Sequence, residues 1–306
     1  MAHFSVRRGE GPLYRRDHDA RHAEKGSPLT HLTGAASSAV RPVLESARAP
    51  ARVLAAVSMG VYLEVRTELE PSVIALITGE ATRLPNSVLL AGELPHVSVG
   101  DEAAVGDGVI ELGRYRVKAR RWWDPSPALP SVDLVRLAQA TSALSPQTTR
   151  RPGLEGNAAI TLLALGLRGG LAAEGPWTAA AEQLVGLGPG LTPSGDDVLA
   201  GLLVALRHLG SAAKVERAVW LADWLAAAVT FDAGTRTTPI SATLLHCAAR
   251  GEASPEVSAV LRGITGQQAL EPALRRLLQL GHTSGADLAQ GVRIGLDSVL
   301  ALGARP

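Results

Sequence analysis

The residues best suited to chemistry in this chain form a glycine-rich turn that recurs in shorter form near the C-terminus. The first copy, residues 186–197, reads GLGPGLTPSGDD, and the second, residues 282–287, reads HTSGAD. The match continues into the apolar stretch after each turn, at a constant spacing between the copies. The matched pairs are Ser194 and Ser284, Gly195 and Gly285, Asp197 and Asp287, Gly201 and Gly291, Val204 and Ile294, and Leu206 and Leu296. A polar turn that leads into an apolar helix is therefore predicted twice.

Each predicted helix start could bind a small anion. The first backbone N–H groups of a helix have no partner within it, and this end carries a partial positive charge. Ser194 is predicted to cap the first helix, so that the Gly195, Asp196 and Asp197 amides point outward. If both helix starts face one cleft, they form a receptor for phosphate or carboxylate. The alternative is an ordinary capped helix after a Gly/Pro loop.

Three titratable residues in these turns are candidate catalytic groups. Asp196 and Asp197 would repel a bound anion unless one of them binds a cation, is protonated or accepts a substrate N–H. We therefore expect at least one of them to contact an amide or ammonium group. His282 could donate to a substrate oxygen or act as an acid or base. The alternatives are a local structural role for His282 and simple stabilisation of a helix terminus by Asp287.

Two further loops carry polar residues that could reach a ligand. Arg236 lies among threonines and offers a planar fork suited to carboxylate or phosphate, although a solvated turn would look the same. Asn86 and Ser87 could bind a ligand at a domain boundary, or simply lead into a strand. The predicted binding residues are Asn86, Ser87, Gly190, Thr192, Ser194, Gly195, Arg236, Thr237, Thr238, Ser241, Thr283, Ser284, Gly285 and Asp287.

The chain divides into a tail and two regions that differ in their pattern of apolar and turn-forming residues. These patterns predict an α+β protein. Residues 1–30 are polar, basic and without periodicity, as is typical of a mobile tail. Residues 31–128 contain short apolar runs separated by Gly, Pro, Asn and Asp, which predict an antiparallel β-rich domain, a small barrel or sandwich. Residues 129–306 are predicted to be mostly α-helical and to carry the anion-binding motifs.

Apolar periodicity and capping residues place the helices in the second region. The glycines Gly210, Gly251 and Gly281 are predicted to follow helix ends. Gly201 and Gly291 lie inside helices at matched positions, which indicates that these two helices pack closely. The predicted helices cover 131–144, 157–168, 176–186, 194–209, 212–230, 239–250, 255–262, 267–280 and 285–302.

Composition excludes several classes of function. The chain has 306 residues, 46% of them hydrophobic, and a net charge of +1, which gives no electrostatic case for binding nucleic acid. Its one cysteine, Cys247, excludes an internal disulfide and a multi-cysteine metal site. No apolar run has the length of a membrane span or forms the core of a signal peptide, so we expect a cytoplasmic protein without a membrane partner. Familiar nucleotide, zinc and nucleophile-elbow motifs are missing, and we expect no cofactor and no metal.

Four segments of the chain resemble the AllH-like family, over about residues 50–303. They are Gly188–Asp197, Leu84–Ser87, Thr238–Ser241 and Gly281–Asp287. This family was long a domain of unknown function, and some members are assigned as a subunit of oxamate carbamoyltransferase in anaerobic allantoin breakdown. The resemblance implies carbamoyl transfer, in which oxalurate and phosphate give oxamate and carbamoyl phosphate. It also implies an FdrA-like partner subunit and a third protein.

The resemblance implies roles for the candidate residues. The helix-start amides and Arg236 would hold phosphate or carboxylate, and Asp196 or Asp197 would accept the amide N–H of the substrate. The chain departs from the family pattern at Thr238-Pro239, where an asparagine is expected before Ile-Ser. Two other functions stay open: a noncatalytic scaffold or sensor that binds a small anion, and a phosphotransferase whose Mg²⁺ is held by Asp196, Asp197 and Asp287.

Overall fold

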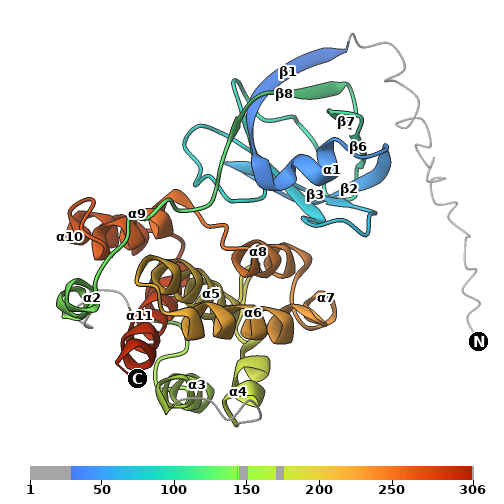
Figure 1. The fold of residues 1–306 in the computed structure, drawn as a ribbon. Helices are drawn as coiled ribbons and strands as arrows, with labels where there is room; N and C mark the ends of the chain where they lie inside the picture. Colours follow the sequence, from blue (N-terminus) through green and yellow to red (C-terminus); the bar gives the residue numbers. More distant parts are fainter. Residues whose placement is uncertain (1–28, 143, 145–150, 170–175, 305–306) are drawn as a thin grey trace, which may run out of the picture.

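The protein consists of a β-barrel lobe and a helical lobe, and helix α8 of the second lies against strand β4 of the first (Figure 1). This computed structural model describes residues 29–142, 144, 151–169 and 176–304. Almost all of the tail predicted over residues 1–30 therefore lies outside the described residues. The division proposed at residues 128–129 falls between the last strand, β8, and the first long helix, α2.

In the part of the chain that the structure describes, eight strands close into a barrel, which is one of the two architectures predicted. Their order around the barrel is β1-β5-β4-β3-β2-β6-β7-β8. Aliphatic side chains such as Val53, Leu63, Ile74 and Ile110 fill the interior of the barrel. They alternate along the strands with side chains that face outward. The strands are β1 Thr30–Ser37, β2 Ala49–Val57, β3 Gly60–Val65, β4 Val73–Ile77, β5 Ser87–Leu90, β6 Glu102–Gly106, β7 Val109–Leu112 and β8 Tyr115–Trp123, with η1 Ser38–Val40 and α1 Arg41–Leu44 between β1 and β2.

The barrel is mixed rather than wholly antiparallel. Six strand pairs are antiparallel, but β1 pairs with β8 and β4 with β5 in parallel. A parallel pair needs a connection that returns the chain to the end where the first strand began. Residues 78–86 make this return between β4 and β5, and they carry the loop before Ser87 toward the helical lobe.

Apolar helices form the second lobe, and their positions agree closely with the periodicity. Gly251 and Gly281 adopt φ values of +82° and +54° after helix ends, as predicted. Gly210 does not end its helix, because α5 continues through it and packs there against Ala218. The helices are α2 Leu134–Thr141, α3 Ala158–Gly169, α4 Pro176–Leu184, α5 Ser194–Ala212, α6 Glu216–Thr230, α7 Ala233–Arg236, α8 Pro239–Ala249, α9 Pro255–Ile264, α10 Leu270–Leu277 and α11 Ser284–Gly303.

The centre of the helical lobe is the crossing of α5 and α11, whose contacts are reciprocal. A Cβ atom on Gly201 would lie 2.2 Å from the carbonyl oxygen of Leu288, and one on Gly291 would lie 2.0 Å from that of Val198. The close packing predicted from these glycines is confirmed. Since residues 198 and 288 also correspond in the duplicated sequence, the two helices are related by an approximate two-fold axis.

The turns before these helices repeat the same geometry. Leu187 N–H donates to Leu184, and Leu280 N–H donates to Leu277 in the same way. A Cβ atom on Gly195 or Gly285 would lie 2.0 Å from the carbonyl oxygen at the end of the preceding helix, α4 or α10. The sequence repeat is therefore a structural repeat of a helix, a turn and a second helix.

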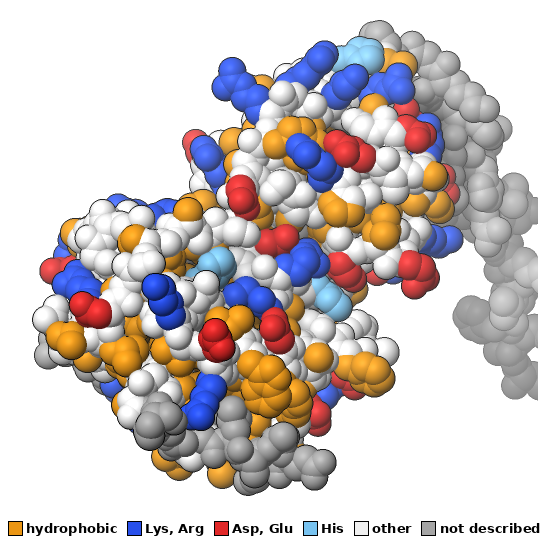
Figure 2. All heavy atoms as spheres, in the orientation of Figure 1, with side chains coloured by type: hydrophobic (Ala, Val, Ile, Leu, Met, Phe, Trp, Pro, Cys, Tyr) orange, Lys and Arg blue, Asp and Glu red, His pale blue; other side chains and the backbone are white. Residues whose placement is uncertain are grey.

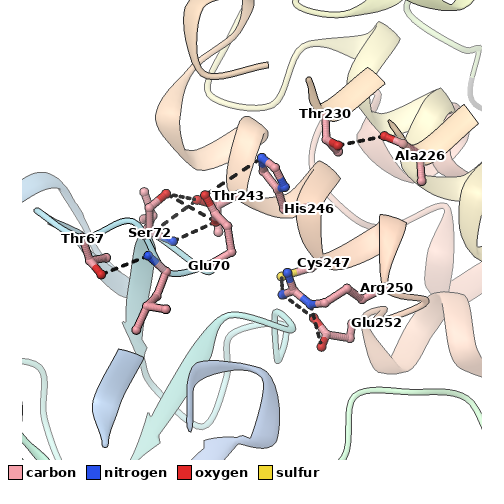
Figure 3. A network of polar contacts seen from close by, with 12 residues as sticks. Thr67, Glu70, Ser72, Ala226, Thr230, Thr243, His246, Cys247, Arg250 and Glu252 are labelled. Atoms are coloured by element: carbon pink, nitrogen blue, oxygen red, sulfur yellow. Dashed lines mark hydrogen bonds and ion pairs between the residues drawn. The ribbon is translucent and has the colours of Figure 1, made fainter. Parts of the chain in front are cut away.

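The two lobes are joined by hydrogen bonds between α8 and the start of β4 (Figure 3). Thr243 Oγ1 accepts the Val73 N–H at 3.2 Å and lies 3.2 Å from Ser72 Oγ. Nearby, His246 Nε2 lies 3.9 Å from Glu70 Oε1. Side chains of both charges gather along this junction on the face shown in Figure 2. These contacts fix α8 against the barrel and so fix one wall of the cavity described below.

Within the described residues, none of the helices combines the length and the apolar character that crossing a bilayer requires.

Candidate functional site

The two copies of the turn meet at one cavity between the lobes. Thr192 Oγ1 lies 3.2 Å from Ser284 Oγ, and Ser194 Oγ lies 3.4 Å from Thr283 Oγ1. A cavity of about 230 Å³ opens beside the first of these pairs, and Asp197 also lines it. The convergence of both turns on one cleft, which the duplicated sequence suggests, is therefore present in the structure.

Most of the cavity wall is apolar. It includes small and aliphatic side chains from α5, α8, α9 and α11, and loop residues from the barrel between β4 and β5. The second carboxylate on the wall, Glu252, is paired with Arg250 at 2.9 Å, and Figure 3 shows this pair next to α8. The lining residues are Thr82, Leu84, Pro85, Thr192, Asp197, Ala200, Val204, Leu244, Ala248, Glu252, Ala253, Ser254, Val257, Leu280, Gly281, Ser284 and Leu288.

The lining just given, which covers only residues that the structure describes, contains no lysine, arginine or histidine. A phosphate dianion taken from water into such surroundings would lose its hydration without gaining an opposite charge. The cavity is therefore better suited to a neutral polar group, such as an amide, than to a free anion.

The helix-start amides do not point into the cavity, so this part of the sequence prediction is wrong. Gly195 N–H donates to Leu187 at 2.9 Å, and the N–H groups of Asp196 and Asp197 donate to Pro193. The second copy is the same, because Gly285 N–H donates to Leu280 and the next two amides donate to Thr283. The preceding turn thus folds back to satisfy the first amide of each helix, and the carbonyl oxygen of the N-cap residue, Pro193 or Thr283, accepts the next two.

Ser194 does not cap its helix, contrary to prediction. Pro193 occupies the capping position, and its side chain makes no capping hydrogen bond. Ser194 is instead the first helical residue, is buried, and directs its hydroxyl toward Thr283 of the other copy. Its role is to join the two copies.

Asp196 stabilises the fold around the cavity and does not line it. It is 1% exposed. Its Oδ1 accepts the Gly186 N–H at 2.8 Å, and its Oδ2 accepts the hydroxyls of Ser241, at 2.7 Å, and Thr237. One carboxylate thus ties the first turn to the segment that begins α8. Thr238 adds to this tie by donating to Leu191 at 2.5 Å while it caps α8.

Asp197 is the carboxyl group that reaches the cavity. It is 7% exposed, and its Oδ2 is buried without a hydrogen-bond partner. Burial raises the pKa of Asp197 to about 8, while the Ser284 and Thr192 hydroxyls lower it and the charge of Asp287 raises it. At neutral pH this side chain is therefore mostly a neutral carboxylic acid, which can donate a proton as well as accept a hydrogen bond.

Asp287 occupies the corresponding place in the other copy. It is fully buried, and its Oδ1 accepts the Gly153 N–H at 2.8 Å, whereas its Oδ2 has no partner. Burial raises the pKa of Asp287, while hydrogen bonds from Ser194, Gly153 and Thr283 lower it.

The remaining predicted site residues lie outside the cavity lining. Arg236 donates to the carbonyl oxygen of Glu182 and lies 3.5 Å from Asp232. His282 and Gly190 are exposed. Asn86 and Ser87 are buried in the barrel, where they donate to Val73 at 2.9 Å and to Leu84 at 2.6 Å. Asn86 and Ser87 thus hold the end of the loop in place, and the two residues before them, Leu84 and Pro85, do line the cavity.

Sequence reasoning missed the apolar part of the cavity wall. Leu84 and Pro85 belong to a segment that the sequence had singled out, so their position next to Asn86 was a usable signal. Leu244, Ala248 and Val257 gave no such signal, because apolar residues at helical spacing look like ordinary core. Gly153 also gave none, since its contact with Asp287 joins residues far apart in the chain.

Among the described residues, no group of three or more His, Cys, Asp or Glu side chains is arranged to hold a metal ion. The three carboxylates considered for Mg²⁺ do not converge, because Asp196 turns toward α8, Asp197 toward the cavity and Asp287 toward Gly153.

Comparison with known proteins relates part of the helical lobe to one family. Residues 184–296 match the family model described as oxamate carbamoyltransferase subunit AllH. This segment is AllH-like. It begins at the end of α4 and ends within α11, so it contains both turns, Asp197 and Ser284. The barrel lies outside the AllH match, and no solved structure matches the chain.

Proposed function

We propose that this chain is a subunit of a carbamoyltransferase and that the cavity beside Asp197 and Ser284 is its substrate site. One observation carries the proposal: the AllH match spans both copies of the turn, and both copies border this cavity. The proposed reaction converts oxalurate and phosphate to oxamate and carbamoyl phosphate. A carboxyl group and two hydroxyls are suitable partners for a carbamoyl group, which has N–H donors and a carbonyl acceptor.

The reaction needs a proton at the nitrogen that leaves. A phosphate oxygen attacks the ureido carbonyl carbon, the bond from that carbon to the oxamate nitrogen breaks, and the nitrogen takes up one proton. In the proposed mechanism Asp197 gives this proton and regains one from the attacking phosphate, because its raised pKa keeps it protonated near neutrality. Ser284 and Thr192 would donate hydrogen bonds to the carbonyl oxygen as negative charge develops on it.

The anionic groups of the substrates need a positive charge that the described cavity lining does not supply. We propose that an FdrA-like partner subunit contributes it at the assembled site. The family description names a subunit, which supports an assembly of more than one protein. Arg236 is not proposed for this role, because its guanidinium group is directed to Glu182 and Asp232.

A noncatalytic binding subunit is the second candidate. It is favoured by the fact that only one of the three predicted catalytic residues, Asp197, lines the cavity. Asp196 is committed to hydrogen bonds within the fold, and His282 is exposed. In this case the cavity would sense the substrate or product, and removal of the Asp197 carboxyl would leave turnover intact.

The decisive experiment measures carbamoyl phosphate formed from oxalurate and phosphate by the chain together with its FdrA-like partner and the third protein. Asp197→Asn is expected to reduce kcat by about 100-fold or more, in the range of lost general acid catalysis. Asp223→Asn makes the same chemical change at an exposed ion pair and should leave kcat unchanged. Unchanged turnover in Asp197→Asn would favour the sensor, and a failure to form carbamoyl phosphate from any ureido acid would contradict both the reaction and the class.

A further inference from the structure

One half of the duplicated site already holds an amide group. The Gly153 N–H donates to Asp287 Oδ1 at 2.8 Å. The same glycine lies against two hydroxyls, because a Cβ atom on it would be 2.2 Å from Ser194 Oγ and 3.3 Å from Thr283 Oγ1. Asp287, Ser194 and Thr283 therefore form a polar pocket that is filled by a peptide unit of the chain itself.

The cavity contains the counterpart of each of these three residues. Asp197 corresponds to Asp287 and Ser284 to Ser194 in the sequence repeat, and Thr192 takes the place of Thr283. The contact of Thr192 with Ser284, at 3.2 Å, matches the contact of Ser194 with Thr283, at 3.4 Å. In each half the serine comes from one helix start and the aspartate from the other. The group around Asp197 and the group around Asp287 thus consist of the same residue types, and the two helix starts contribute to them in the same way.

The two halves differ in what lies beside the aspartate. Beside Asp287 the space is filled by the peptide unit of Gly153. Beside Asp197 the space is a cavity, and within the described ranges of the chain no segment is inserted into it. Asp197 is more than nine-tenths buried, and its Oδ2 lacks a hydrogen-bond partner, as does the Oδ2 of Asp287. The difference between the halves is therefore the space beside the carboxyl, which a peptide unit fills at Asp287 and a ligand can enter at Asp197. A buried polar atom of this kind is stabilised by a ligand that supplies the missing donor.

We propose that Asp197, Ser284 and Thr192 bind the amide end of the substrate, with Asp197 accepting an amide N–H as Asp287 accepts that of Gly153. The choice of ligand rests on the proposed function, but the binding geometry is inferred from the half of the site in which Gly153 contacts Asp287. A carboxyl group can accept an N–H through its carbonyl oxygen in either protonation state. The amide end therefore points toward Asp197, and the carboxylate or phosphate end points away from it.

The surroundings of Asp197 discriminate between the two ends of such a substrate. A carboxylate placed there would meet a second carboxyl group and apolar walls, and none of the lining residues given above is cationic. A primary amide has no net charge and supplies N–H donors. The site should therefore prefer oxamate over oxalate, because these two acids differ only in the replacement of one carboxylate by an amide.

The test is calorimetric titration of the full chain, assembled with its FdrA-like partner and the third protein, with oxamate and with oxalate. We expect oxamate to bind at least ten times more tightly, and Asp197→Ala to remove this preference. Asp223→Asn, at an exposed position on α6, should retain it. Equal affinities, preference for oxalate, binding of neither acid, or a preference that survives Asp197→Ala in a folded variant would overturn the proposal. If Asp197→Ala does not fold, Ser284→Ala is used instead, with the same expected loss.

The outcomes separate this inference from the proposed reaction. If the chain prefers oxamate through Asp197 but its complex makes no carbamoyl phosphate, the amide site stands and the carbamoyltransferase proposal fails. If the complex makes carbamoyl phosphate but oxamate binds no better than oxalate, the carbamoyltransferase proposal stands and the amide site fails. A structure of the oxamate complex adds a direct check, because the amide nitrogen rather than the carboxylate should lie within hydrogen-bond distance of Asp197.

Discussion

The hydroxyl of Thr192 lies 3.2 Å from the hydroxyl of Ser284, although 92 residues separate them in the chain. This contact joins the turn before α5 to the start of α11, at the edge of the cavity. It depends on how closely the two helices approach, since each turn belongs to one of them. The geometry of the candidate site is thus set by the crossing of α5 and α11, where Leu288 contacts Gly201 and also lines the cavity.

That crossing predicts the effect of a single methyl group. In Gly291→Ala the new Cβ atom would lie 2.0 Å from the Val198 carbonyl oxygen, so the helices must move apart. Overpacking of this kind costs about 2 kcal/mol or more in the free energy of unfolding, which urea denaturation will measure. Gly79→Ala is the matched control, because a Cβ atom on Gly79 would have no other atom within 4 Å. Equal stability of both variants would show that the crossing is looser than described.

The adjacent aspartates predict opposite responses to the same substitution. Asp196→Asn replaces an acceptor that receives Gly186 N–H and two hydroxyls, so at least one of these donors loses its partner. We expect this variant to lose about 2–3 kcal/mol of stability. Asp197→Asn removes a carboxyl that lacks a partner at Oδ2, and its stability should be equal or higher at neutral pH. Denaturant midpoints compare the two, and a larger loss at residue 197 than at 196 would contradict the assignment of roles.

The sequence repeat was sufficient to predict the close helix packing and the meeting of the two turns. Gly201 and Gly291 were informative because a glycine inside a helix is unfavourable unless another backbone needs the space. Apolar periodicity likewise located the helices, and the short runs in the first region predicted a barrel or a sandwich. These features are local, so they can be recognised without knowledge of the tertiary structure.

The contacts that each side chain makes in the folded protein could not be predicted in the same way. Asp196 and Asp197 are neighbours with the same chemistry, and only the approach of Ser241 to one of them separates a fold-stabilising carboxylate from a cavity carboxyl. The Gly195 and Gly285 amides looked free because the sequence does not show that the preceding turns fold back onto them. Parallel pairing of β1 with β8 was missed for a similar reason, because it joins the two ends of the barrel sequence.

The raised pKa of Asp197 predicts how stability depends on pH. In the unfolded chain this carboxyl has its ordinary pKa near 3.8, whereas burial raises it to about 8 in the folded protein. Its contribution to stability is therefore fully present below about pH 4 and is lost as the pH rises toward 8, by about 1.4 kcal/mol for each pH unit at most. Asp197→Asn does not titrate, so its stability relative to the native chain should increase over this range.

The measurement is a series of urea unfolding curves between pH 4 and pH 8.5 for both proteins. Asp287, whose pKa burial also raises, contributes in the same direction but is present in both, so the difference between them isolates Asp197. Asp196 and Glu252, the other carboxylates near Asp197, are likewise retained in both proteins. A difference in unfolding free energy that stays constant across the range would mean that Asp197 titrates normally, and that the proton assigned to it in the proposed reaction must come from another group.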